Sequence, residues 1–341
     1  MPALTAFDVF DSNGGFSLLT LTDAINKAPH KPRRIAELGL FEESGAPTTK
    51  IAVEERNGVL YLVPSVARGA PANVNTHSRR TLRELSTVHL PIHDRIYADS
   101  IQNIREFGSD NALTTMQAKT NEYLESMRGS LEATIEYQRL GAIKGVILDA
   151  DGTTELADMF SLFEVTQEAE VDFALDAGSP VPGEVRAKCS AIIRLIEDAL
   201  GDLPYDGVHS FVGPAFMDAL VDHSECRDAY ARWNQGEQMR AQVARRTFFY
   251  AGITFEEYRG KVGAIDYIGT DAAHFFPVGA PKLFRTVYAP AGYGDTVNTP
   301  GLPLYAKAVR DTADRWVDIY AESNPISFCT RPKALMKGKR T

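Results

Sequence analysis

The chain has 341 residues, of which 44% are hydrophobic, which is enough to fill the cores of two compact lobes. Its formal net charge is −9, whereas a nucleic-acid-binding protein needs a basic surface that releases counterions from phosphate. No apolar run approaches the roughly 18 residues of a membrane span, and the start of the chain lacks the pattern of a signal peptide. The composition therefore disfavours direct nucleic-acid binding and membrane insertion, and it predicts synthesis in the cytoplasm.

The cysteine pattern indicates neither disulfides nor a zinc site. Cys189, Cys226 and Cys329 are odd in number and widely spaced, and none belongs to a CxxC motif. We expect all three thiols to be buried as small apolar side chains.

The first third of the chain predicts an arm followed by a long excursion. A short helix is expected at 21–27, ended by Pro29 and Pro32, within an otherwise extended segment. The pair Asn57-Gly58 accepts the backbone angles of a tight turn and predicts a hairpin over 48–64. Residues 65–78 have almost nothing to bury and predict a projecting loop.

Residues 81–96 return as strand-like sequence, in which Pro91 excludes a central position in a sheet. An isolated two-stranded hairpin of this kind is not stable alone in water. It therefore needs a surface to lie on, and a neighbouring subunit is the obvious candidate.

Apolar residues at three- and four-residue steps predict one long amphipathic helix over 111–143. Its stripe includes Leu124, Met127, Leu131 and Ile135, which we expect to pack inward. At 1.5 Å per residue the helix would run ~45 Å. The pairs Glu125 with Arg128 and Glu136 with Arg139 are expected on the solvent-exposed face. A strand and a hairpin turn at Asp151-Gly152 follow.

Beyond the prolines at 180–182 the pattern predicts a second lobe with a mixed α+β sheet. Helices are expected at 184–200 and 214–233, and strands at 207–212, 246–253, 262–268 and 273–278. A Gly/Pro loop over 288–303 precedes a partly helical stretch and a strand within 304–320. The basic end, with Lys333, Lys337, Lys339 and Arg340, is expected to be a short solvated tail.

Five strings in order carry a family resemblance, the most informative being the turn, short strand and Arg-Pro stop of 321–335. The others are 38–41, then 62–64 with 68–71, then 104–108, then 144–152. Together they resemble the lambda-like major capsid protein E family of tailed bacteriophages. The resemblance implies a shell-building protein and no enzyme.

The fold that the resemblance implies is the α+β coat-protein fold of tailed phages. Its parts would be an N-terminal arm at 1–46, an extended β-hairpin loop at 47–95, a peripheral lobe with a long spine helix at 96–180 joined by 306–341, and a mixed-sheet axial lobe at 181–305. The implied contact residues between subunits lie in the extended loop: Asn57, Gly58, Arg68, Gly69, Arg79 and Arg80.

The implied function is a major capsid protein that self-assembles into pentamers and hexamers of an icosahedral shell around double-stranded DNA. The packaged DNA would be near the protein only non-specifically, and no cofactor is implied. No long charged helical extension precedes the arm, so the resemblance implies a separate scaffolding protein, together with a portal protein. A decoration protein and a maturation protease are left open. The expected location is the virion, assembled in the cytoplasm of the bacterial host.

The alternative function is a Mg²⁺-dependent phosphatase of the haloacid-dehalogenase type, because 146–154 is an apolar strand ending in Asp-x-Asp-Gly-Thr. In that mechanism Asp149 would attack phosphorus and Asp151 would act as the general acid. However, the string follows a long helix in mid-chain, and no later acidic pair follows a strand. We therefore favour a hairpin turn satisfied by its own Asp side chains.

A metal site is the last alternative, because His89 and His93 are four residues apart and adjacent to Asp94. Pro91 between them removes the helix that would bring both imidazoles to one face. The metal reading is therefore disfavoured.

Overall fold

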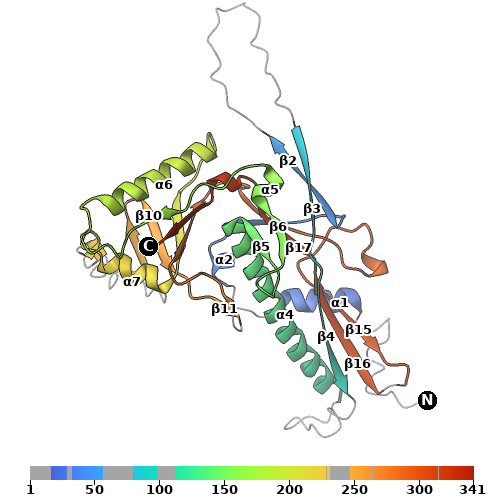
Figure 1. Cartoon of the computed structure of the whole chain (residues 1–341). Helices are drawn as coiled ribbons and strands as arrows, with labels where there is room; N and C mark the ends of the chain where they lie inside the picture. The colour runs from blue at the N-terminus through green and yellow to red at the C-terminus, as the bar shows by residue number, and fades with distance from the viewer. Residues whose placement is uncertain are drawn as a thin grey trace, which may run out of the picture. The chain divides into compact units, whose positions relative to one another are not determined.

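We analysed a computed structural model of the chain (Figure 1). The structure describes residues 17–28, 33–56, 80–97, 112–227, 229–230, 246–262, 265–313 and 315–341. The chain forms two compact units: the first comprises residues 1–51, 85–138 and 286–327, and the second comprises residues 52–84, 139–285 and 328–341. Among the described residues, no helix is both long enough and apolar enough to cross a membrane.

The first unit contains an antiparallel sheet with strand order β15-β16-β4. These strands are β15 (Tyr305–Arg310), β16 (Trp316–Ser323) and β4 (Leu90–Tyr97). The position of β4 at the edge confirms the inference from Pro91. The partly helical stretch predicted within 304–320 is wrong, because those residues alternate with the period of two that suits a half-buried strand.

The core of the first unit lies on one face of this sheet. It is covered by α1 (Leu18–Lys27) and α4 (Ala112–Lys144), which agrees with the long helix predicted at 111–143. Leu124, Met127 and Leu131 of α4 belong to this core, and Ile135 is also buried. The other core residues are Leu21, Ile25, Ile96, Leu304, Ala306, Val317, Ile319 and Ala321.

The expected solvent-exposed face of α4 is wrong in part. Arg128, Glu136 and Arg139 are all buried, and the Glu136 carboxylate accepts a hydrogen bond of 2.7 Å from the Ile35 amide. Ile35 lies in the short helix α2 (Arg34–Glu37). Two opposite charges three residues apart on a helix can each bind a partner elsewhere in the chain. Their spacing therefore did not show which face of α4 is exposed to solvent.

A further three-stranded sheet has the order β1-β14-β17. Its strands are β1 (Phe41–Gly45), β14 (Phe284–Tyr288) and β17 (Pro325–Cys329). The hydroxyls of Thr286 and Ser327, both buried, lie 2.9 Å apart and satisfy each other within the first unit.

The second unit is built on a six-stranded sheet with order β7-β18-β13-β8-β10-β9. The strands are β7 (Val171–Asp172), β18 (Met336–Lys339), β13 (Ala272–Val278), β8 (Gly207–Val212), β10 (Ile253–Glu257) and β9 (Thr247–Tyr250). Helices α6 (Glu184–Leu200) and α7 (Pro214–Asp222) belong to the same unit. Phe216 of α7 packs edge-on against Phe173, with ring centroids 5.3 Å apart.

Three predicted elements of this unit are corrected. The strand expected at 246–253 is a hairpin, because Ala251 and Gly252 form a turn with φ of 48° and 86°. The strand at 262–268 is two short strands, β11 (Lys261–Val262) and β12 (Ile265–Asp266). Helix α7 ends at Asp222 rather than 233, because His223 leaves the helical conformation (φ −59°, ψ 135°) and residues 223–226 form a turn before helical backbone resumes at Arg227.

The solvated basic tail is also a wrong prediction. β18 pairs with β13 on one side and with β7 on the other, so it is an inner strand of the sheet. Its lysines form ion pairs: Lys337 with Glu170 at 3.1 Å and Lys339 with Asp172 at 3.7 Å. The described residues also include two 3₁₀ helices, η2 (Gly294–Thr296) and η3 (Pro332–Ala334).

Candidate assembly surfaces

The predicted extended loop at 47–95 contains a two-stranded ribbon of β2 (Lys50–Arg56) and β3 (Arg80–Ser86). Asn57, Gly58, Arg68, Gly69 and Arg79 lie outside the described residues, so the predicted hairpin at Asn57-Gly58 does too. Arg80 is the first residue of β3, and its side chain also lies outside the described part.

The root of this ribbon is hydrogen-bonded within the first unit. The Thr87 amide donates to the Thr49 carbonyl at 2.9 Å, and the Thr87 hydroxyl donates to the same oxygen at 3.1 Å. Next along the chain, the Val88 amide donates to the Pro325 carbonyl at 2.9 Å. These bonds fix where the ribbon leaves the first unit.

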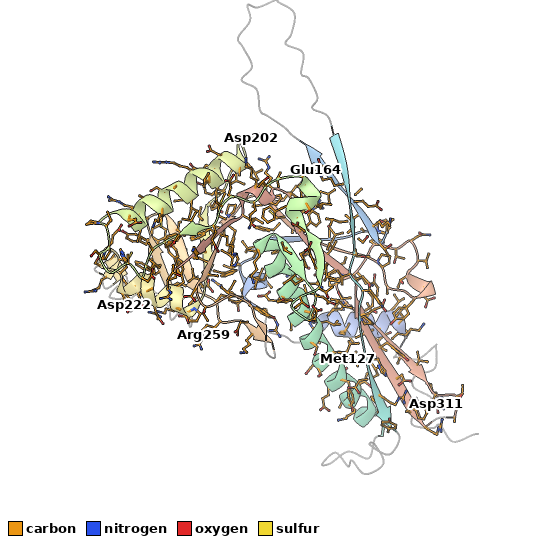
Figure 2. The ribbon with its side chains drawn as sticks, in the orientation of Figure 1. Met127, Glu164, Asp202, Asp222, Arg259 and Asp311 are labelled. Atoms are coloured by element: carbon orange, nitrogen blue, oxygen red, sulfur yellow. The ribbon has the colours of Figure 1, made fainter. Side chains whose placement is uncertain are left out.

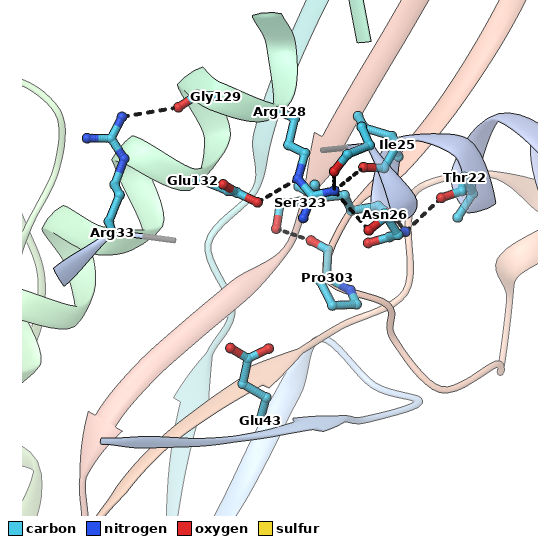
Figure 3. Close-up of polar contacts among 12 residues, drawn as sticks. Thr22, Ile25, Asn26, Arg33, Glu43, Arg128, Gly129, Glu132, Pro303 and Ser323 are labelled. Carbon is cyan, nitrogen blue, oxygen red and sulfur yellow. Dashed lines mark hydrogen bonds and ion pairs between the residues drawn. The ribbon is translucent and has the colours of Figure 1, made fainter. Parts of the chain in front are cut away.

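The helix α1 is fastened to α4 by Arg128 (Figure 3). Arg128 Nη1 lies within 2.8 Å of the carbonyl oxygens of Ile25, Asn26 and Ala28, and its Nε donates to Glu132 at 2.7 Å. The last carbonyls of a helix have no partner inside the helix, so a buried guanidinium satisfies them. Sequence reasoning missed this role, because it placed Arg128 on the solvent-exposed face.

Two polar side chains of α1 also contact β15 and the residues before it. The Ala306 amide donates to the Thr22 hydroxyl at 3.2 Å, and Asn26 Nδ2 donates to the Leu304 carbonyl at 2.8 Å. Because β15 is an edge strand of the sheet that the described residues form, its outer amides have no partner strand within that sheet. Thr22 therefore covers part of an edge that would otherwise be open to pairing.

The face of the β15-β16-β4 sheet opposite the core is rich in exposed aromatic side chains. Tyr97, Val309 and Tyr320 are 51%, 43% and 37% exposed, and the strand register places all three on this face. Trp316 lies opposite Tyr97, with ring centroids 6.3 Å apart. We call this the open face of the sheet.

The polar groups of the open face surround Trp316. The guanidinium carbons of Arg95 and Arg315 lie 4.5 Å and 4.3 Å from its ring. Arg95 also pairs with Asp318 at 2.7 Å, and Arg315 pairs with Asp311 at 3.1 Å. These arginines are compensated by carboxylates, so the open face is not a site built for phosphate. The period-two alternation of 316–323 is the sequence signal that would have revealed it.

The histidines of the metal hypothesis have other partners. His89 Nδ1 lies 2.7 Å from the Asn324 side-chain oxygen, and His93 stacks on Tyr320 with centroids 5.5 Å apart. Among the described residues, no group of three His, Cys, Asp or Glu side chains could hold a metal ion.

Asp149 and Asp151 lie in the turn between β5 (Val146–Leu148) and β6 (Glu155–Asp158). Asp151 accepts hydrogen bonds from the amides of Thr153 and Thr154 at 2.9 and 2.8 Å. The Thr154 hydroxyl donates to the same carboxylate at 2.5 Å and, together with these amides, holds the pKa of Asp151 well below its ordinary value. A phosphatase would need a raised pKa at Asp151, because a general acid must carry a proton near neutral pH.

The three cysteines are buried and unpaired with each other. Burial raises the pKa of each thiol to about 12. They are therefore apolar side chains rather than nucleophiles at neutral pH.

Comparison with a solved structure identifies the fold. A crystal structure of a prophage protein of Escherichia coli CFT073 that is assigned as a capsid protein shares the fold, with a TM-score of 0.58 and 12% identity. The likeness covers 95% of this chain and 99% of that one. The fold is thus the α+β coat-protein fold.

Residues 17–340 match the family described as Phage major capsid protein E. The chain therefore belongs to this family, and it is a major capsid protein of a phage shell and a component of the virion. Proteins of this family are structural proteins rather than enzymes, and no comparison supports the phosphatase alternative.

Two curated relatives carry the same description. The major capsid protein of Salmonella phage Felix O1 is 27% identical over 94% of this chain and 95% of its own length. The major capsid protein of Pseudomonas phage KPP10 is 26% identical over 95% of this chain and 97% of its own length.

Proposed function

We propose that this chain forms the pentamers and hexamers of an icosahedral shell around double-stranded DNA, and that the open face is one of its contacts between subunits. The observation that carries the proposal is the cluster of Trp316, Tyr97 and Tyr320 on the face opposite the core, where Tyr97 and Tyr320 are 51% and 37% exposed among the described residues. Tyr, Trp and Arg dominate the binding energy of protein interfaces. In a shell built mainly from one chain, the partner is a second copy of that chain.

The acidic net charge of −9 supports a shell that does not bind the DNA inside it. We therefore place the packaged DNA near the protein by non-specific proximity only. The separate scaffolding protein, the portal protein and a decoration protein are proposed partners, and assembly is proposed to occur in the cytoplasm of the bacterial host.

The roles of the other parts of the chain follow from the coat-protein fold. We propose that residues 1–46 act as the arm, 47–95 as the extended loop, 96–180 with 306–341 as the peripheral lobe and 181–305 as the axial lobe. Within the loop, residues 57–79 would lie across a neighbouring subunit, with Arg68, Arg79 and Arg80 meeting acidic groups there.

The test replaces the two exposed tyrosines of the open face by Tyr97→Ser and Tyr320→Ser. Truncating exposed side chains should leave the subunit folded by circular dichroism, whereas closed shells in negative-stain micrographs should fall at least tenfold. Phe249→Ser is the matched control, because Phe249 is an aromatic residue of 48% exposure on another sheet. Normal shells from the double variant would contradict the proposal that the open face is a contact between subunits.

A further inference from the structure

The side chain of Arg83 ties the base of the extended loop to the rest of the second unit. The ribbon belongs to that unit from residue 52 and up to residue 84. Arg83 of β3 is nearly buried, its side chain being 13% exposed. Its Nη1 donates to the Leu162 carbonyl, and its Nη2 lies 3.5 Å from the Glu164 carboxylate. Its guanidinium carbon lies 5.7 Å from the centre of the Phe163 ring.

Leu162, Phe163 and Glu164 belong to or end α5 (Met159–Phe163) (Figure 2, where Glu164 is labelled). This helix is firmly held. The Asp158 carboxylate caps its first turn by accepting from the Phe160 amide at 2.8 Å and from the Ser161 hydroxyl at 2.5 Å. A Cβ on Gly145 would lie 2.2 Å from the Phe160 ring, so α5 is packed directly against the backbone there. The helix is therefore a fixed support for Arg83.

The contacts of Arg83 are unequal in weight. Glu164 is 82% exposed, so its ion pair with Arg83 is screened by water and stabilises little. The Leu162 carbonyl lies in the last turn of α5, where carbonyls lack an intrahelical partner, and Arg83 supplies one. Holding this carbonyl and the Phe163 ring together requires the planar fork of a guanidinium, which an ammonium cannot reproduce.

We propose that Arg83 is a positioning residue of shell assembly: its contact with α5 sets the direction in which the β2-β3 ribbon leaves the second unit, and so presents residues 57–79 to a neighbouring subunit. The Thr49–Thr87 bonds hold the root of the ribbon, and Arg83 holds β3 against α5 within the second unit. The inference rests on the proposed role of the extended loop between subunits.

The experiment measures ribbon direction and assembly separately. Spin labels at Ala52→Cys on β2 and Ala191→Cys on α6, both exposed positions of the second unit, report the distance between ribbon and helix by pulsed electron resonance. The three native thiols are buried and label poorly. The variants are Arg83→Met and Arg83→Lys, and the matched control is Arg194→Met, which removes an exposed arginine of α6.

We expect both Arg83 variants to remain folded by circular dichroism, to at least double the width of the distance distribution and to lower the yield of closed shells at least tenfold. The control should match the wild type in all three measurements. If Arg83→Met fails to fold, the test rests on Arg83→Lys, because this variant keeps the charge and the aliphatic stem and is the more conservative change. An unchanged distance distribution together with normal shells in a folded Arg83 variant overturns the inference.

The companion variant replaces residues 66–78 by a short Gly-Ser turn and tests the proposed function of the loop itself. Normal shells from that deletion would contradict the role of the loop, whatever Arg83 does. Loss of shells from the deletion, combined with normal shells from the Arg83 variants, would contradict the positioning role alone.

Discussion

Arg128 Nη1 lies 2.7 Å from the carbonyl oxygen of Ala28, the residue that ends α1. A residue in the middle of the long helix thereby fixes the end of a helix about 100 positions earlier in the chain. The same nitrogen lies 2.8 Å from the Asn26 carbonyl, so one guanidinium serves several carbonyls that the helix leaves without partners.

We expect Arg128→Met to destabilise the fold by about 2–3 kcal/mol, because it leaves buried carbonyl oxygens without a donor. Glu132→Gln should cost less, since the carbonyl contacts of Arg128 remain. Urea unfolding followed by circular dichroism measures both. Equal midpoints for Arg128→Met and the wild type would show that water replaces the guanidinium at no cost.

Leu131→Asp should give insoluble or unassembled protein, because Leu131 lies in the core formed by α4 and the β15-β16-β4 sheet. An unpaired charge placed there would cost several kcal/mol. The matched control is Ser126→Asp, on the exposed side of the same helix. The measurement is the soluble fraction after expression and the count of shells in negative stain. A soluble, fully assembling Leu131→Asp would contradict the burial of this stripe.

Deleting residues 66–78 in favour of a short Gly-Ser turn should leave a folded, soluble subunit with unchanged helix content and should abolish closed shells. The segment is too poor in apolar residues to contribute to its own subunit's core. Many weak contacts repeated around each ring would supply the cooperativity of assembly. A subunit that unfolds without the segment would refute the assignment as an inter-subunit contact.

Asp149→Asn with Asp151→Asn should leave shell assembly intact and produce only a small loss of thermal stability. The sign of the pH dependence follows from the lowered pKa of Asp151. A carboxyl whose folded pKa is depressed stabilises above its unfolded pKa, and this stabilisation is lost as the pH falls through the folded value. The difference in melting temperature between wild type and variant should therefore be present at pH 7 and shrink as the pH falls below about 4. A phosphatase rate abolished by the variant would sink the structural interpretation.

His274 predicts a loss of stability in acid. Burial, with lesser contributions from Lys144 and Lys337, lowers the pKa of His274 from 6.5 to about 3. Between these two pKa values His274 is protonated in the unfolded chain but not in the folded chain. The free energy of unfolding therefore falls as the pH drops from about 6.5 toward 3. His274→Gln should show a shallower loss over that range in urea titrations. An identical pH profile for the variant would mean that His274 is not responsible.

Local pattern was sufficient for a large part of the fold. The stripe at 124–135 forms a helix because it has the helical period, and Pro91 sits in an edge strand because it cannot donate to a second neighbour. Asp151 lies in a turn because its short carboxylate reaches nearby amides. In each case the deciding interactions lie within a few residues.

What the sequence by itself determined, then, is the family, through five strings in order, together with those local elements whose period or turn residues mark them. The tertiary structure alone decided that Gly338 pairs with Ala273 and Val171, which turns an apparent tail into an inner strand. It also decided that Arg128 and Arg83 are buried against backbone carbonyls. Their partners lie between about 65 and 170 positions away. No local spacing encodes these pairs, because a strand or a charge is satisfied equally well by any partner that the fold brings near.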